Sequence, residues 1–409
     1  MSEQAIKRQE YLHAILASDS PRKLIVAGPG TGKTYTFGGL IRSHPPDNTL
    51  ALTFIRKLVA DMEDDFGDVA EVKTFHAYCR MLLHQSFGAV DLIPYLTQII
   101  TEDAEAAAIT FSSFTHAFQT LQIGSQEVAY YLNRGTYYRA VSFDDSVFRV
   151  YQAGDAGTLF LPKYALVVID EFQDFNPLEA PLINQLQNAS PILIVGDDDQ
   201  AVYSLRNASA DLLREKHLSG EYDVFDLPFC SRCPRVVVET TTAFVDAVKK
   251  AGGFTQRIPR PFVAYLDDKV YENGAYPKVL TATTANIPGL ASLIRKAINL
   301  IPKQDIHEAH EKQYPCVLIV GQRQYLNYLH KNLQQYFPHV EFAQSNAMLY
   351  SMADGYEFLM ENDDSNLGWR ILAGSGLPKA DLGPVLAASH EGGRFTSLLG
   401  EGWSLSFPG

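Results

Sequence analysis

The sequence predicts an α/β protein in which a parallel sheet with a helical insertion is followed by a second, partial α/β domain. Short apolar runs alternate with segments of helical periodicity, as is typical of a parallel sheet with helices on both faces. These runs lie at 24–26, 50–53, 166–169 and 192–195. A helical stretch at 87–163 is too long for a loop and indicates an inserted subdomain. New strand and helix runs begin after a proline-containing linker at 259–261 and indicate a further domain.

Four parts are therefore expected along the chain. Residues 1–86 and 164–252 form the first α/β domain, and 87–163 form its helical insertion. The first domain closes with a helix that follows Pro234 and ends at a glycine pair. A partial second α/β domain occupies 262–372, with strands at 279–281 and 316–320. Residues 373–409 are a truncated tail or the start of a further subdomain.

Composition excludes several classes of protein. The 409 residues are 46% hydrophobic and 20% charged, as in ordinary folded proteins. The net charge is −13, so any nucleic-acid site must be local. The sequence has no apolar run of the ~18 residues needed to span a bilayer and no leader at its N-terminus, which predicts a cytoplasmic protein with no membrane partner. Four cysteines are too few for a disulfide framework, and the CxxC of Cys230 and Cys233 lacks further zinc ligands, which favours a structural or incidental role.

The first apolar run leads into a glycine-rich turn and then a helix. Such a turn points backbone N–H groups inward and the helix N-terminus adds a positive dipole, which suits a polyphosphate. Lys33 would contact the β- and γ-phosphates, and the Thr34 hydroxyl would bind Mg²⁺. A turn that binds nothing is the alternative, which the flanking strand and helix disfavour. The residues expected to hold the nucleotide here are Ala27, Gly28, Pro29, Gly30, Thr31, Gly32, Lys33 and Thr34.

Carboxylates follow two further apolar runs, at the sheet edge where ligands bind in open α/β folds. Asp170 would hold Mg²⁺, and Glu171 would polarise the water that attacks the γ-phosphate. Acidic residues that merely end a strand are the alternative. After the run at 192–195, three aspartates precede Gln200, which could sense the γ-phosphate, although three consecutive carboxylates are more often a solvated turn.

Together these motifs resemble the UvrD/Rep type of superfamily 1 helicases over roughly residues 1–250. Residues 27–34 resemble the phosphate loop of that family, 170–174 its DExQD signature, and 196–206 its GDxxQ segment and the arginine that follows. The resemblance implies a RecA-like P-loop ATPase domain that uses ATP and Mg²⁺. It also implies that Gln9 reads adenine and that Arg232 reaches the γ-phosphate. The catalytic set is then Lys33, Asp170, Glu171, Gln200 and Arg232, with Thr34 and Asp170 as metal ligands.

The resemblance also implies a nucleic-acid groove, because two segments match those that contact DNA in the family. Leu205 departs from the pattern, since the family has Trp or Phe there and a base stacks on it. The expected contacts are Thr53, Arg56, Lys57, His76, Tyr78, Tyr203 and Arg206.

The expected function is an ATP-dependent 3′–5′ DNA helicase, or its N-terminal portion, acting on single-stranded DNA or a partial duplex. The likeness is weaker after residue 278, and the family's later motor segments are absent. The chain alone is therefore expected to hydrolyse ATP weakly and not to unwind DNA, and a protein partner could supply the missing motor half. The alternative is a non-motor module, or half of a split complex, that binds ATP and single-stranded nucleic acid. A small-molecule P-loop kinase is disfavoured because such enzymes lack the DExQD and GDxxQ pair.

Overall fold

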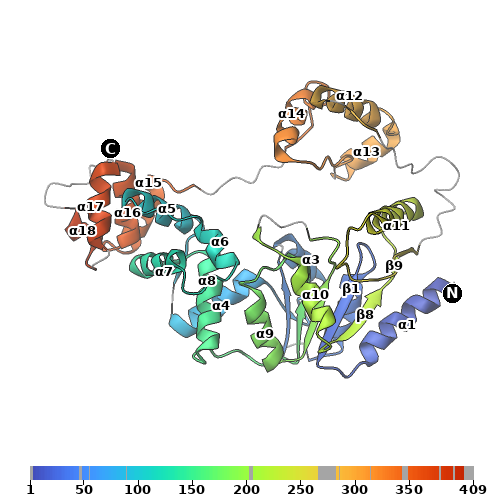
Figure 1. Ribbon diagram of the computed structural model, residues 1–409, viewed down its shortest axis with the longest axis horizontal. Coiled ribbons are helices and arrows are strands. Elements are labelled where there is room, and N and C mark those ends of the chain that lie inside the picture. The colour runs from blue at the N-terminus through green and yellow to red at the C-terminus, as the bar shows by residue number, and fades with distance from the viewer. Residues whose placement is uncertain are drawn as a thin grey trace. The chain divides into compact units, whose positions relative to one another are not determined.

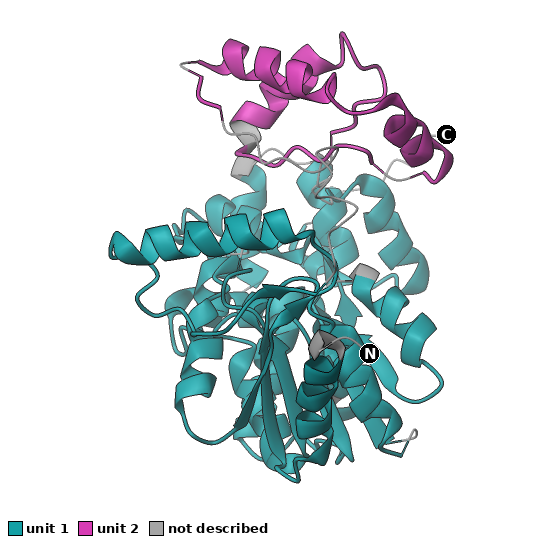
Figure 2. Cartoon of the chain, turned by 90° about the vertical axis from the view of Figure 1, so that its right-hand side faces the viewer, with its two compact units in different colours: residues 1–277, 348–409 teal, residues 278–347 magenta. Residues whose placement is uncertain are grey.

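The computed structural model divides the chain into two compact units, coloured separately in Figure 2. One unit comprises residues 1–277 and 348–409, and the other comprises 278–347. The structure describes residues 3–45, 48–54, 56–88, 90–201, 206–265, 282–284, 286–313, 315–342, 349–376, 379–389 and 392–399.

A six-stranded parallel sheet forms the centre of the first unit (Figure 1). Its strands follow the order β3-β2-β6-β7-β1-β8. They are β1 (Arg22–Ala27), β2 (Thr49–Thr53), β3 (Glu71–Thr74), β6 (Leu166–Ile169), β7 (Ile192–Gly196) and β8 (Asp223–Leu227). All described pairs in the sheet are parallel, so the carboxyl ends of the strands lie at one edge. The four predicted apolar runs coincide with β1, β2, β6 and β7, which confirms the predicted parallel sheet.

Alternate residues of the strands feed two separate cores, because successive side chains point to opposite faces of a sheet. One core contains Leu24 and Val26 and extends to the helical insertion. The other contains Ile25 and Ala27 and is covered by the first helices of the chain. The helices around the sheet are α1 (Glu3–Ala17), α2 (Lys33–Arg42), α3 (Arg56–Phe66), α4 (Phe75–Phe87), α9 (Ala180–Ala189) and α10 (Ala210–Leu218).

The stretch at 87–163 is helical, as predicted. It contains β4 (Asp91–Leu92), α5 (Leu96–Ala106), α6 (Phe114–Gln119), α7 (Gln126–Tyr138), β5 (Ala140–Val141) and α8 (Phe143–Asp155). Serine side chains start three of these helices, since Ser113, Ser125 and Ser142 each accept a hydrogen bond from a backbone N–H in the first turn. The helix predicted after Pro234 forms as α11 (Arg235–Lys250), and the short strands β9 (Phe229–Cys230) and β10 (Val263–Ala264) pair with each other.

The last helices of the chain pack against the insertion rather than joining the second unit. They are α15 (Met352–Glu361), α16 (Asn366–Gly376), α17 (Lys379–Ser389) and α18 (Phe395–Leu398). Asp103 of α5 joins them through a fully buried network, in which it accepts hydrogen bonds from Arg134 Nη2 at 2.9 Å and Arg370 Nε at 2.5 Å. Arg134 Nη1 also donates to Ser389 Oγ at 2.6 Å. The predicted boundary at 372, between a second domain and a tail, is therefore wrong. Arg370 and Ser389 lie on either side of it and meet in one network.

The second unit is helical in its described part, with α12 (Ile287–Ile298), α13 (Lys303–Glu311) and α14 (Arg323–Leu333). The strand predicted at 316–320 does not form, since these residues have no regular secondary structure. Leu318 and Val320 are 80% and 84% exposed, and an isolated strand has no partner for its backbone groups. The strand predicted at 279–281 lies outside the described residues. Among the described helices, none combines the length and apolar character needed to cross a membrane.

Candidate functional site

The glycine-rich turn after β1 forms a loop that leads directly into α2. Gly30 and Gly32 have φ angles of 69° and 90°, a left-handed conformation that residues with a Cβ rarely adopt. Thr31 Oγ1 donates to Gly28 O at 2.8 Å, which ties the loop to the end of the strand. Because Gly32 is the N-cap of α2, the loop N–H groups and the helix dipole act at one place. The predicted phosphate-binding residues, 27–34, thus run from the end of β1 through the loop into the first turn of α2.

Lys33 meets the acidic pair that follows β6. Its Nζ lies 3.1 Å from Glu171 Oε2, and both side chains are mostly buried. Gln173 Nε2 donates to the same Glu171 oxygen at 2.7 Å. Glu171 has a φ of 52°, an uncommon conformation for a residue other than glycine, and the turn that it makes leads into the short helix η2 (Phe172–Asp174). Two residues that are 138 positions apart in sequence thus form the centre of the site.

Asp170 is buried beside this ion pair. Glu171 N donates to Asp170 Oδ1 at 3.0 Å. Burial, together with the neighbouring Glu171 charge, raises the pKa of Asp170 to about 7, although Lys33 opposes the rise. Burial and Glu171 also raise the pKa of Asp174 to about 7. A crowded group of carboxylates is relieved by a cation, and carboxylate and hydroxyl oxygens are ligands that Mg²⁺ takes, so Asp170 and the exposed Thr34 of α2 fit that ion.

Two of the three aspartates after β7 are buried, so the segment is not a fully solvated turn, although Asp199 is exposed. Asp197 and Asp198 are 0% and 5% exposed. Asp197 N donates to Gln173 Oε1 at 2.9 Å, and Gln200 Nε2 donates to Asp197 Oδ2 at 2.6 Å. The predicted residue Gln200 is thus linked through Asp197 and Gln173 to Glu171.

Arg232 lies in a segment that packs against the phosphate loop. Ser231 N donates to Gly30 O at 2.8 Å, and Cys230 Sγ donates to Pro29 O at 3.2 Å. A Cβ on Gly30 would lie only 2.4 Å from Arg232 Cβ, so the loop needs glycine for this close approach. Arg232 itself is exposed. The structural role expected for the CxxC agrees with the contact of Cys230 with the loop.

The first helix reaches the loop through a residue that the sequence analysis did not predict. Gln9 is exposed on α1, whereas the neighbouring Arg8 lies beside the loop, with Nη2 at 2.9 Å from the position a Cβ on Gly32 would occupy. The Arg8 guanidinium also stacks over the Tyr265 ring at 4.9 Å. Tyr265 is 257 positions from Arg8, so sequence spacing gave no signal of this pair.

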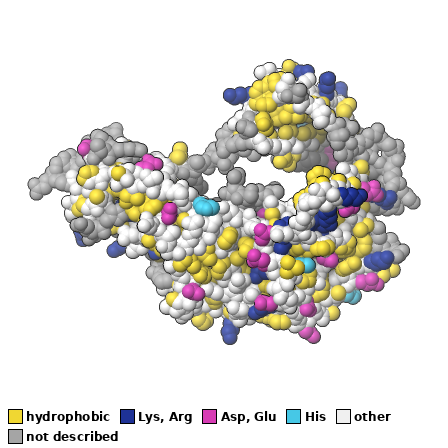
Figure 3. Space-filling model, in the orientation of Figure 1, with side chains coloured by type: hydrophobic (Ala, Val, Ile, Leu, Met, Phe, Trp, Pro, Cys, Tyr) yellow, Lys and Arg dark blue, Asp and Glu magenta, His cyan; other side chains and the backbone are white. Residues whose placement is uncertain are grey.

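A groove of about 1030 Å³ is lined by α3, β3, α4 and the insertion. Phe54, His76, Phe143 and Arg206 line it, and the Arg206 guanidinium stacks over the Phe54 ring at 4.1 Å. The His76 ring makes edge contacts with Phe54 and Phe143. The face of the molecule in Figure 3 carries Lys and Arg interspersed with Asp and Glu, consistent with a local rather than a general nucleic-acid site.

The predicted nucleic-acid residues divide into three groups. His76 and Arg206 line the groove. Thr53 and Tyr78 are both fully buried, so the prediction that they contact nucleic acid is wrong for this conformation. Tyr78 instead packs in the core beside Tyr164. Arg56 and Lys57 begin α3, but their side chains lie outside the described residues, as does Tyr203 entirely.

The buried carboxyl group of Glu179 lies next to the His76 ring. Glu179 is completely buried and accepts a hydrogen bond from Asn176 N at 2.9 Å. Its Oε1 lies 3.5 Å from His76 Nε2. Burial raises the pKa of Glu179 to about 8, so the carboxyl group is mostly protonated at neutral pH. The sequence analysis did not identify Glu179, because nothing in its local sequence distinguishes it from a surface acid.

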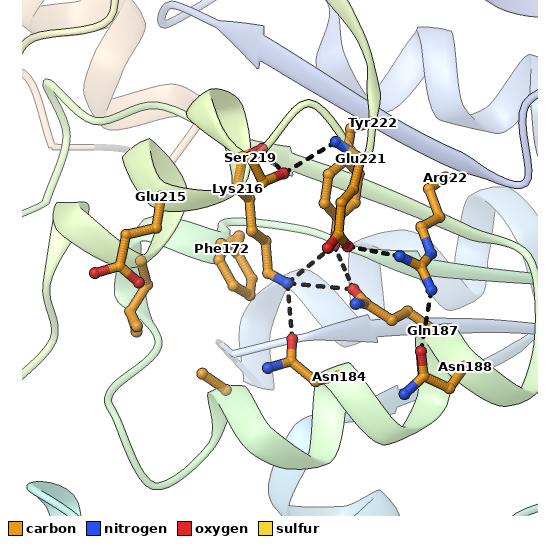
Figure 4. Close-up of a pocket in the computed structure, with 12 residues that line it drawn as sticks. Arg22, Phe172, Asn184, Gln187, Asn188, Glu215, Lys216, Ser219, Glu221 and Tyr222 are labelled. Atoms are coloured by element: carbon orange, nitrogen blue, oxygen red, sulfur yellow. Dashed lines mark hydrogen bonds and ion pairs between the residues drawn. The ribbon is translucent and has the colours of Figure 1, made fainter.

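A second pocket, of about 430 Å³, lies between α9, α10 and β8 (Figure 4). Lys216 Nζ donates to Asn184 Oδ1 at 2.9 Å, Gln187 Oε1 at 3.2 Å and the Tyr222 hydroxyl at 2.9 Å. A lysine has three N–H donors, and these three acceptors account for all of them. Burial lowers the pKa of Lys216 to about 8. The lysine joins α9 to α10 and is a packing group rather than a ligand site.

Comparisons with known proteins agree with this geometry. A family model described as AAA domain matches residues 12–206. The chain is 26% identical over 259 residues to a probable DNA helicase II homolog of Mycoplasma capricolum, covering 50% of this chain and 36% of that protein. It is 24% identical to the ATP-dependent DNA helicase PcrA of Bacillus subtilis, with 48% and 33% covered, and 26% identical to the ATP-dependent DNA helicase Rep of Buchnera aphidicola, with 46% and 37% covered. The matched part spans about a third of the length of these relatives. Residues 12–206 therefore match the AAA domain model and have a RecA-like P-loop fold, and the first half of the chain is similar to DNA helicases of the UvrD/Rep type.

Proposed function

We propose that the chain binds ATP with Mg²⁺, hydrolyses it, and forms the N-terminal portion of a DNA helicase that moves 3′ to 5′ on single-stranded DNA. The ion pair of Lys33 with Glu171 at the mouth of the glycine loop carries this proposal. Lys33 is the proposed phosphate-binding cation and Glu171 the proposed general base, and they lie 3.1 Å apart beside the buried Asp170. The names of the relatives support DNA as the substrate, and a cytoplasmic location remains a prediction from the sequence.

Each residue of the site has a separate proposed role in ATP hydrolysis. The loop N–H groups bind the phosphates, and Lys33 exchanges Glu171 for a phosphate oxygen when ATP enters. Glu171 is then free to accept a proton from the attacking water, and Gln173 keeps its carboxylate oriented. Mg²⁺ held by Thr34 and Asp170 would neutralise charge on the phosphates. Arg232 and Gln200 are proposed to contact the γ-phosphate, and Gln9 the adenine.

Single-stranded DNA is proposed to lie in the groove lined by His76 and Arg206. Unstacked bases stack on rings, which Phe54 and Phe143 supply, and phosphates need cations, which Arg206 supplies. Arg56, Lys57 and Tyr203 remain proposed contacts of the same strand.

A non-motor module that binds ATP and single-stranded nucleic acid is the second candidate. It is favoured by the second unit, whose described residues form helices and no sheet. In that case a protein partner would supply the second motor half.

ATP hydrolysis with and without a single-stranded oligonucleotide tests the proposal. We expect Mg²⁺-dependent ATP binding in calorimetry and a turnover that rises with DNA. Lys33→Ala should abolish both, whereas Lys312→Ala, which removes an exposed ion pair with Glu308 in the second unit, should change neither. No heat of binding with the wild-type chain would refute the nucleotide site. Binding of both ligands without DNA-stimulated turnover would favour the non-motor module.

A further inference from the structure

The segment at 257–265 returns to the sheet edge and contacts both halves of the nucleotide site. Its strand β10 pairs with β9, and Val263 N donates to Pro228 O at 2.8 Å. The Phe262 ring lies 2.9 Å from the position a Cβ on Gly28 would occupy. Ile258 N donates to Asp198 Oδ2 at 2.9 Å. This segment is the last described part of the first unit before the chain passes to the second unit.

Arg260 connects this segment to the three aspartates after β7 through ion pairs with their carboxylates. Its side chain is only 3% exposed. Nη1 donates to Asp198 Oδ1 at 2.5 Å and Nη2 donates to Asp199 Oδ2 at 2.7 Å, and Nη2 also pairs with Asp197 Oδ1. The three carboxylates lie within 4.8 Å of one another, close enough to hold a metal ion, but a guanidinium is bound to all three.

Two further arginines complete the cluster without touching Asp197. Arg214 Nε lies 3.2 Å from Asp198 Oδ2, and Arg257 Nε lies 2.8 Å from Asp199 Oδ1. Among these three arginines, Arg260 is thus the one paired with Asp197, the aspartate that is linked to the catalytic carboxylate.

An unbroken series of contacts runs from Arg260 to the phosphate loop. Arg260 holds the Asp197 side chain, and Asp197 N donates to Gln173 Oε1 at 2.9 Å. The amide group of Gln173 then donates through Nε2 to Glu171 Oε2 at 2.7 Å. That oxygen is the one 3.1 Å from Lys33 Nζ. Because the amide of Gln173 is rigid, a shift of Asp197 moves both of its contacts together.

We propose that Arg260 is a positioning residue for ATP hydrolysis, which aligns Glu171 through Asp197 and Gln173 and so couples the nucleotide site to the segment at 257–265. The proposal rests on the proposed function. Arg260 does not reach the reacting atoms itself, so its loss should lower kcat and leave ATP binding nearly unchanged. Lysine cannot reproduce the planar fork that contacts three carboxylates at once, so Arg260→Lys should restore the fold but only part of the rate.

The closing experiment compares Arg260→Gln and Arg260→Lys with the matched control Arg257→Gln in the full chain. Arg257 belongs to the same cluster and forms its ion pair with Asp199; that residue's backbone N donates to Asp197 Oδ1 at 3.0 Å, but Arg257 does not hold the Asp197 side chain directly. We expect Arg260→Gln to lower kcat about 10- to 100-fold, with the KM for ATP changed less than about threefold. Arg260→Lys should recover part of the rate, and Arg257→Gln should stay within about twofold of wild type. Equal effects of Arg260→Gln and Arg257→Gln, or an unchanged kcat, would overturn the proposal.

Hydrogen exchange supplies a second measurement that does not depend on turnover. Arg260→Gln, or Arg260→Lys if the glutamine variant fails to fold, should speed amide exchange in residues 170–176 and 196–200, whereas Arg257→Gln should not. Unchanged exchange in 170–176 would overturn the proposal even if ATP is hydrolysed. If the wild-type chain does not hydrolyse ATP but Arg260→Gln still speeds exchange in 170–176, the proposed function is refuted. The physical link between Arg260 and Glu171 would then still stand.

Discussion

Replacing Asp103 with asparagine should loosen the last helices of the chain from the insertion. Asp103 is fully buried and accepts hydrogen bonds from Arg134, from Arg370 and, at 2.6 Å, from the Tyr138 hydroxyl. Asparagine keeps the shape but removes the negative charge that, within the described part of the chain, is paired with the guanidinium of Arg134. Breaking a buried ion pair by removing one partner costs about 3–5 kcal/mol, and Asp103 has two such partners, so we expect a loss at or above about 3 kcal/mol.

The matched control is Asp364→Asn. Asp364 pairs with Arg394 at 2.7 Å, but the two side chains are 41% and 68% exposed. An exposed pair contributes about 0–1 kcal/mol, so this variant should be nearly neutral. Denaturant unfolding gives the free energy of unfolding, and hydrogen exchange in 366–389 reports whether these helices open first. A loss below about 1 kcal/mol for Asp103→Asn, or the same exchange in both variants, would refute the reasoning from buried charge.

Three further predictions concern the site. Gly30→Ala forces a Cβ to 2.4 Å from Arg232 Cβ at a φ of 69° and should abolish ATP binding, whereas Gly252→Ala, at a φ of 85° with open space around it, should cost only about 1–2 kcal/mol in thermal unfolding and leave binding intact. Burial raises the pKa of Glu179 from 4.5 to about 8, so above pH 4.5 this carboxyl group ionises more readily in the unfolded chain than in the folded one. Its contribution to the free energy of unfolding is therefore fully present below pH 4.5 and is lost as the pH rises to about 8. At about 1.4 kcal/mol per pH unit, wild type should lose up to about 5 kcal/mol relative to Glu179→Gln across that window, and a flat difference in urea unfolding would contradict this. Arg206→Gln should weaken single-stranded DNA binding and lower the slope of log K against log salt by about 1 in fluorescence titrations, while Arg22→Gln, in the second pocket, should leave that slope unchanged.

The strands that the sequence could predict are the interior strands of the sheet, which have a neighbouring strand on each side. The apolar runs of β1, β2, β6 and β7 identify interior strands, whereas β3 and β8 occupy the two edges of the sheet. Edge strands keep one side open, so Glu71–Thr74 and Asp223–Leu227 mix polar with apolar residues and give no continuous run. The strand expected at 316–320 shows the opposite error, because an apolar run without a neighbouring strand in the described chain forms no sheet.

The site divides in a similar way. Local motifs predicted Lys33 and Glu171, because loop and strand end each carry their own pattern. Arg260 could not be predicted, since its partners lie about 60 positions earlier and no spacing links them. His76 and Tyr78 show a further limit. Residues two positions apart on a helix point in directions about 200° apart, so His76 faces the groove while Tyr78 enters the core.

The order of synthesis has a consequence for Asp103. Arg370 leaves the ribosome 267 residues after it. At roughly 5–20 residues synthesised per second, roughly 13–50 s pass between the synthesis of Asp103 and that of Arg370. During this time Asp103 and Arg134 lie in an incompletely folded interior. We expect the partly folded insertion to stay open to solvent and to chaperones until Arg370 is available to pair with Asp103. Slow translation between codons 138 and 370 should therefore lower the yield of native protein more than slow translation elsewhere.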